Sequence, residues 1–142
     1  MRLIAALAAA IATLAAFGQM PEAERLDTVW APPVDSLRVS GFEKTLRSKK
    51  ESLYLTNRTG QTIAGLGLDI RYMDSQGRTL HERTREMTVT IAPDQTVMVD
   101  FPSFDTQGLY YYYLSPLPPR TTDATPFKVS VTPTYILQKQ TN

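Results

Sequence analysis

His81 is the single histidine of the chain and therefore the only imidazole that could serve as a general base. Nucleophilic catalysis by serine or threonine needs such an imidazole beside an activated hydroxyl group. His81 instead lies within a strongly charged run, 81–86, and the sequence contains no Gly-x-Ser-x-Gly elbow. The absence of cysteine excludes thiol catalysis, thiolate zinc sites, iron–sulfur clusters and disulfides. We expect His81 to be a surface residue of a strand, and we expect no catalytic residue.

Carboxylate pairs are the remaining route to catalysis, because glycosidases work with two acidic side chains. The 14 acidic residues are scattered, and Asp74, Asp94 and Asp105 stand where an aspartate favours a turn. The runs 74–77 and 105–108 offer too few oxygen ligands for a calcium loop. We therefore expect no metal and no cofactor. A carbohydrate-active enzyme is the enzymatic alternative.

Four consecutive tyrosines, 110–113, are followed by a stiff proline-rich loop, 115–120. Alternate residues of a strand face opposite sides, so one pair of tyrosines is expected inside and the other exposed or covered. An exposed tyrosine suits protein interfaces and stacking on sugars. The competing interpretation is that these residues reflect only the high β-propensity of tyrosine. We predict a contact surface of four residues: Tyr110, Tyr112, Leu117 and Arg120.

Residues 1–18 have the layout of a secretory signal peptide, with a basic Arg2, an apolar run over 3–17 and small residues at the end. Small side chains at Ala16 and Gly18 favour cleavage after Gly18, with cleavage after Ala16 nearly as favourable. A retained anchor is the alternative, but a helix over this run would span only about 22 Å of a hydrocarbon core of about 30 Å. We expect export to the periplasm or the cell surface of a Gram-negative bacterium, without stable membrane insertion after cleavage.

The charge of the exported chain is expected to be balanced. Cleavage would remove Arg2 and leave 14 basic against 14 acidic side chains. Nucleic-acid binding depends on an excess of positive charge, so we expect no nucleic-acid partner. One basic cluster, Lys44, Arg47, Lys49 and Lys50, is flanked by glutamates. We interpret this cluster as a solvated loop or strand edge.

The sequence after residue 34 alternates between apolar and polar residues as β-strands do, most clearly over 64–73. We expect about seven strands with turns roughly every 8–12 residues, which indicates an immunoglobulin-like antiparallel β-sandwich over 35–139. Residues 19–34 are expected to form a flexible or PPII-like lead-in, from which Trp30 could dock onto the domain. The ten prolines are expected to avoid strand interiors, because proline cannot donate a hydrogen bond to a sheet.

The runs 52–60 and 68–77 resemble small exported bacterial β-sandwich domains of the FxLYD kind. In those domains a strand ending in Thr-Asn precedes a strand ending in Tyr-x-Asp-x-x-Gly, and Thr56-Asn57 and Tyr72-Met73-Asp74-Ser75-Gln76-Gly77 match these motifs. A Pro-x-x-Thr turn follows in both, here at 93–96, and the resemblance covers roughly 53–101. The chain after residue 18 also resembles uncharacterised exported proteins of Bacteroides-type bacteria. The resemblance implies a fold and an extracytoplasmic setting and supplies no catalytic residues.

These observations together predict a non-enzymatic exported module that acts by binding or as an accessory protein of the cell envelope. Its partner is expected to be another envelope protein or a glycan. A second hypothesis is a structural subunit or chaperone-like protein that works by strand addition, since a sandwich has open edges that accept another strand.

Overall fold

The computed structural model describes residues 25–117 and 123–140. The predicted signal peptide lies outside these residues, and so does Arg120. In the described part every residue belongs to a strand, turn or loop, and no helix long and apolar enough to cross a membrane occurs there. The strands are β1 (Leu26–Trp30), β2 (Leu37–Glu43), β3 (Lys50–Asn57), β4 (Ile63–Met73), β5 (Thr79–Met87), β6 (Thr96–Pro102), β7 (Tyr110–Tyr112) and β8 (Thr125–Lys139).

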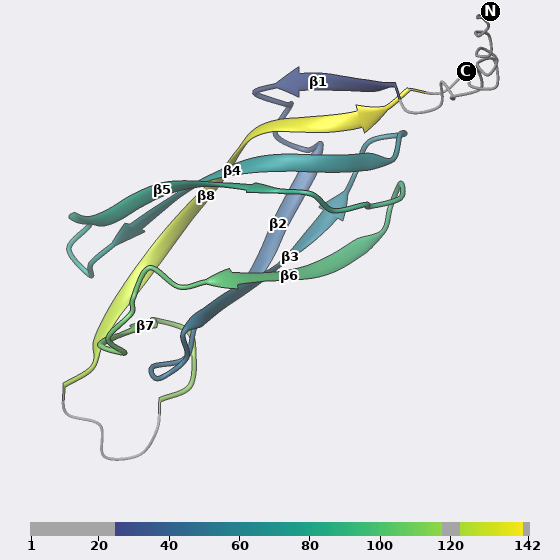
Figure 1. Ribbon diagram of the computed structural model, residues 1–142. Helices are drawn as coiled ribbons and strands as arrows, with labels where there is room; N and C mark the ends of the chain where they lie inside the picture. The colour runs from purple at the N-terminus through teal and green to yellow at the C-terminus, as the bar shows by residue number, and fades with distance from the viewer. Residues whose placement is uncertain (1–24, 118–122, 141–142) are drawn as a thin grey trace, which may run out of the picture.

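The strands form two sheets that face each other across one hydrophobic core (Figure 1). The larger sheet has the order β1-β8-β4-β5, and β7 pairs with β8 as well. The smaller sheet has the order β2-β3-β6. Every pairing is antiparallel except that of β7 with β8. The prediction of an all-β chain built from two antiparallel sheets is confirmed.

β4 is the strand that the sequence predicts best. It pairs with β5 along one side and with β8 along the other, and alternate side chains on its inner face are almost completely buried. Asp69 and Arg71, on the opposite face, are exposed, as the period of two predicts. The inner-face residues are Leu66, Leu68, Ile70 and Tyr72.

β1 corrects the prediction that 19–34 is a flexible lead-in throughout. Residues 26–30 of that stretch form a strand that pairs with the end of β8, from Leu26 opposite Lys139 to Trp30 opposite Tyr135. The rings of Trp30 and Tyr135 lie with their centroids 5.2 Å apart, so the docking of Trp30 is a contact between neighbouring strands. β1 has almost no buried face, which explains why its sequence carries no apolar period.

Pro133 corrects the prediction that prolines avoid strand interiors, since it lies within the long strand β8. The pairing of β8 with β4 shifts at this point: Gly67 faces Tyr135, whereas Leu68 faces Pro133. Thr134 is therefore an extra residue, and this bulge accommodates a proline that could not join a regular ladder.

Gly67 lies on the outer face of β4, where the side chains of Tyr135 and Thr134 cover it. A Cβ atom at this position would meet the ring of Tyr135 and would lie 2.7 Å from Thr134 Oγ1. Aromatic side chains of one strand often cover a glycine of the next in this way. Gly60 offers a contrast, because a Cβ atom there would have no neighbour within 4 Å.

We expect Gly67→Ala to lower the free energy of unfolding by about 1–3 kcal/mol, because the added methyl group overpacks the contact with Tyr135. Gly60→Ala is the matched control and is expected to leave stability nearly unchanged. Thermal and urea unfolding of both variants measure the difference. Equal stability of the two variants would contradict the close approach of Tyr135 to Gly67.

Candidate functional site

Two tyrosines of the run 110–113 face the core, and they are the two that were predicted to belong to the contact surface. Tyr110 and Tyr112 are half-buried and pack against the core. The Tyr112 ring lies 4.9 Å from that of Phe42, and the Tyr110 ring lies 5.6 Å from that of Phe104. The prediction that Tyr110 and Tyr112 are exposed is therefore wrong. The parallel pairing of β7 with the start of β8 turns these two rings onto the aromatic core.

Exposed apolar side chains gather instead at both ends of β7. We call them the apolar tip; they fall within nine residues of the sequence, and the most exposed is Leu114, at 69 %. The predicted Leu117 is one of them, at 45 %, whereas Arg120 lies outside the described residues. Lys128 Nζ lies 5.4 Å from the centre of the Tyr113 ring. The apolar tip consists of Leu109, Tyr113, Leu114 and Leu117.

A buried ion pair fixes the loop from which the apolar tip projects. Lys44 Nζ lies 2.8 Å from Asp105 Oδ2, and both side chains are almost completely buried. The same ammonium group donates hydrogen bonds to the carbonyl oxygens of Leu46 and Tyr110. Lys44 thus departs from the predicted solvated cluster, whose other members have more exposed side chains. A buried ammonium group needs such partners, because burial of an unpaired charge is strongly unfavourable.

Asp105 also holds the loop through hydrogen bonds from its backbone N–H groups. Its Oδ1 accepts from the backbone N–H groups of Gly108 and Leu109, and its Oδ2 accepts from that of Tyr110. Burial alone would raise the pKa of Asp105, but the hydrogen bonds from Lys44 and the backbone outweigh it and hold the pKa below its usual range. The predicted turn role of Asp105 is confirmed, and the ion pair adds to it.

Glu51 is the centre of a second buried cluster of polar groups. Its Oε1 accepts from the Tyr72 hydroxyl group at 2.5 Å and from the Arg83 guanidinium group at 3.3 Å. Its Oε2 accepts from Ser103 Oγ at 2.9 Å and from the Phe104 backbone N–H at 3.0 Å. Burial and the neighbouring Glu51 carboxylate raise the pKa of Tyr72, so its hydroxyl group stays protonated and donates. This cluster joins β3, β4 and β5 to the segment that leads to Asp105.

Neither buried cluster presents a reactive group to solvent. Glu51 and Tyr72 are completely buried, and Asp105 is engaged by four donors. His81 is exposed, as predicted, and its ring stacks on that of Phe104 at a centroid distance of 5.7 Å. Within residues 25–117 and 123–140, no group of three or more histidine or acidic side chains could hold a metal ion. The geometry supports a structural role for these charges.

Lys44 and Glu51 are the buried charged residues of the site that the sequence analysis did not predict. For Glu51 a signal was present: it shares the inward parity of Leu53, Leu55 and Asn57 on β3, all of which are buried. A charged residue at an inward position of a strand indicates a buried partner. No comparable signal distinguishes Lys44 from its exposed basic neighbours.

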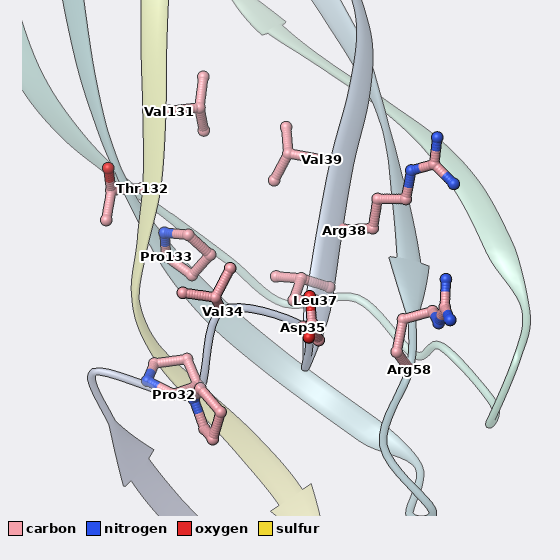
Figure 2. A pocket seen from close by; sticks show the side chains of 11 residues that line it. Pro32, Val34, Asp35, Leu37, Arg38, Val39, Arg58, Val131, Thr132 and Pro133 are labelled. Carbon is pink, nitrogen blue, oxygen red and sulfur yellow. The ribbon is translucent and has the colours of Figure 1, made fainter.

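A groove of about 640 Å³ lies between β2 and β8, which belong to different sheets (Figure 2). Val39 and Val131 reach toward each other across it, with Pro133 and Val34 below them. Arg38 and Arg58 lie on the other side of β2 from β8. The groove therefore has an apolar interior, and its two arginines lie beyond β2.

We expect Asp105→Asn to lower the free energy of unfolding by about 3–5 kcal/mol at neutral pH, because it leaves the buried Lys44 ammonium group without its counterion. The matched control is Asp100→Asn, which breaks the exposed pair of Asp100 with Lys50 and is expected to change stability by at most about 1 kcal/mol.

The pH dependence of unfolding tests the same pair. Because the pKa of Asp105 is lowered in the folded state, its contribution is present above the unfolded value of about 3.9 and is lost as the pH falls through the folded value. Denaturant unfolding should therefore show a shallower acid destabilisation for Asp105→Asn than for the wild type. Equal losses from Asp105→Asn and Asp100→Asn at neutral pH would contradict the buried pair.

No protein-family model matches this chain, and no curated protein or solved structure gives a match to it. The resemblance to domains of the FxLYD kind therefore stays a prediction that depends on the motifs of the sequence alone.

Proposed function

We propose that this protein is an exported, non-enzymatic binding module of the bacterial cell envelope and that the apolar tip is its contact surface. The observation that carries the proposal is that four exposed large apolar side chains fall within nine residues of the chain, on either side of β7. Soluble proteins rarely leave such side chains together in water unless a partner covers them. The partner class is another envelope protein or a glycan, because the tyrosine side chain suits protein interfaces and stacks on sugars.

The buried ion pair of Lys44 and Asp105, which holds the loop that carries the apolar tip, supports this function. Asp105 accepts hydrogen bonds from the backbone N–H groups of Gly108, Leu109 and Tyr110. Lys44 donates a hydrogen bond to the carbonyl oxygen of Tyr110. A surface held in one geometry before binding loses little conformational entropy when its partner arrives. Tyr110 and Tyr112 contribute by anchoring β7 to the core, which leaves Tyr113 and Leu114 facing outward.

The order of the strands supports an immunoglobulin-like arrangement for the module. β2 lies beside β3 and β3 beside β6, as strands A, B and E do in that fold. β4 lies beside β8 as C lies beside F, and β1 takes the place next to β8 that strand G would have. The proposed export depends on the signal layout of 1–18, and the balanced charge of the exported chain argues against a nucleic-acid partner.

Capture of partners from an envelope extract of the native bacterium, with the tagged full chain as bait, tests the contact surface. We expect the double variant Tyr113→Ser, Leu114→Ser to capture its main partner about tenfold less efficiently, because exposed apolar anchors dominate such contacts. Thermal unfolding should show a loss of stability of at most about 1 kcal/mol, since Leu114 is mostly exposed and the Tyr113 ring loses only its contacts with Tyr112 and Lys128. Met98→Ser removes an exposed apolar side chain elsewhere and is the matched control. Undiminished capture by the double variant would remove the apolar tip from consideration.

Mass spectrometry of the protein recovered from the periplasm of a Gram-negative host tests export. We expect a chain that begins at Gln19, and we expect Gly18→Leu to abolish or displace this cleavage, because the peptidase requires a small side chain there. Gln19→Ser leaves the required positions intact and is the control. Retention of the intact chain in the cytoplasm would contradict the proposal.

A further inference from the structure

β8 has a long continuous partner strand on only one of its two sides. β4 follows one side of it from Lys128 to Gln138. On the other side β7 pairs only with 125–127 and β1 only with 135–139. Among the described residues no strand pairs with 128–134 on that side. We call this interval the β8 gap; it measures roughly 20 Å at about 3.3 Å per residue.

The backbone groups of two valines point into the β8 gap. The N–H and C=O of one strand residue point to the same side, and those of its neighbours point to the other. The Thr125 N–H donates to the Leu109 carbonyl oxygen and the Phe127 carbonyl oxygen accepts from the Tyr113 N–H, both at 2.9 Å and both away from β4. Val129 and Val131 have the same parity, so their N–H and C=O groups face the gap. The neighbouring Ser130 and Thr132 face β4.

The two ends of the β8 gap are closed to further pairing. Pro133 has the parity of the valines but has no N–H to donate. At Thr134 the bulge changes which residues direct their backbone groups away from β4: the even-numbered ones now do so. The Thr134 carbonyl oxygen accepts from the Ala31 N–H at 2.8 Å. β7 closes the other end at Phe127. An incoming strand therefore finds donors and acceptors at Val129 and Val131 and only an acceptor at Pro133, which limits it to a short segment.

The groove of Figure 2 lies beside the β8 gap. Val131 and Pro133 belong to both, and Val39 of β2 faces Val131 across the groove. A strand added to β8 would direct alternate side chains into this apolar space, as core-facing residues of the sheet do. The lining includes two arginines, Arg38 and Arg58, beyond β2 and one aspartate, Asp35, so its net charge is positive and favours acidic residues in the segment.

We propose that the β8 gap is a binding site for a short extended segment of a partner protein, which adds to the larger sheet between β7 and β1. The segment has apolar residues at alternate positions and acidic residues at its ends. A second copy of β8 does not fit, because its own β7 and β1 flank it. This site shares no residue with the apolar tip, and its test is independent of the test of the proposed function.

Amide hydrogen exchange, measured by NMR on residues 19–142, tests whether the β8 gap is unpaired. We expect the Val129 and Val131 amides to exchange at least about tenfold faster than those of Ser130 and Thr132, which are bonded to β4. Equal protection of all four amides in dilute protein would overturn the proposal, because another part of the chain would then cover the gap. Protection of the valine amides that grows with protein concentration alone would also overturn it in favour of a second copy.

A synthetic peptide, acetyl-Glu-Val-Thr-Val-Thr-Val-Glu-amide, is the probe for binding. We expect it to slow exchange at Val129 and Val131 and to bind about tenfold more tightly than the same peptide N-methylated at its interior residues, which cannot pair as a strand. Equal affinity of the two peptides would overturn strand addition. Val131→Pro removes one donor that faces the gap and should weaken binding of the peptide, whereas Val131→Ala keeps the donor and is the matched control. The N-methylated peptide keeps the test valid if Val131→Pro impairs folding, because it leaves the protein unchanged.

Discussion

The long antiparallel pairing of β4 with β8 is the interaction on which the other features of this protein depend. β4 carries the inner face of the larger sheet, and the length of β8 allows β7 and β1 to attach near its two ends. The bulge at Pro133 and Thr134 interrupts this pairing without ending it. It also reverses which backbone groups of β8 face away from β4, and so separates the part that binds β1 from the part that stays open. The positions of the apolar tip and of the groove both follow from this one strand.

Two buried clusters of charged and polar groups join parts of this chain that are distant in the sequence. The chain has no cysteine, yet Lys44 is linked to Asp105 and Glu51 to Tyr72 across wide separations in the sequence. Each charge has several hydrogen-bond partners, which is the condition under which burial of charge is tolerated. Desolvation offsets much of the attraction in such contacts, so their net contribution to stability is smaller than the cost of removing one partner.

Local patterns predicted the half-buried strands and failed where a partner strand decides the structure. The residues of β4 themselves alternate between apolar and polar, so the strand and its buried face were predicted correctly. β1 has no apolar period, because hydrogen bonds to β8 and the contact of Trp30 with Tyr135 hold it in place. The faces of Tyr110 and Tyr112 were assigned wrongly because a strand of three residues takes its orientation from β8. Of the predicted contact residues only Leu117 is exposed in the described part of the chain, and the partners of Lys44 lie too far along the sequence for any local pattern to indicate them.

The pairing of Leu26 with Lys139 places the first and last strands side by side, with both leaving the domain at the same end of β8. β7 and the apolar tip lie by the other end of β8 (Figure 1). A domain tethered through either terminus would hold its apolar tip at the distal end. Mechanical tension between the two termini would load the hydrogen bonds between β1 and β8 one after another, as in a zipper, instead of shearing them together. β1 would then detach at low force, while the ion pair of Lys44 and Asp105 and the tip that it supports would bear no load.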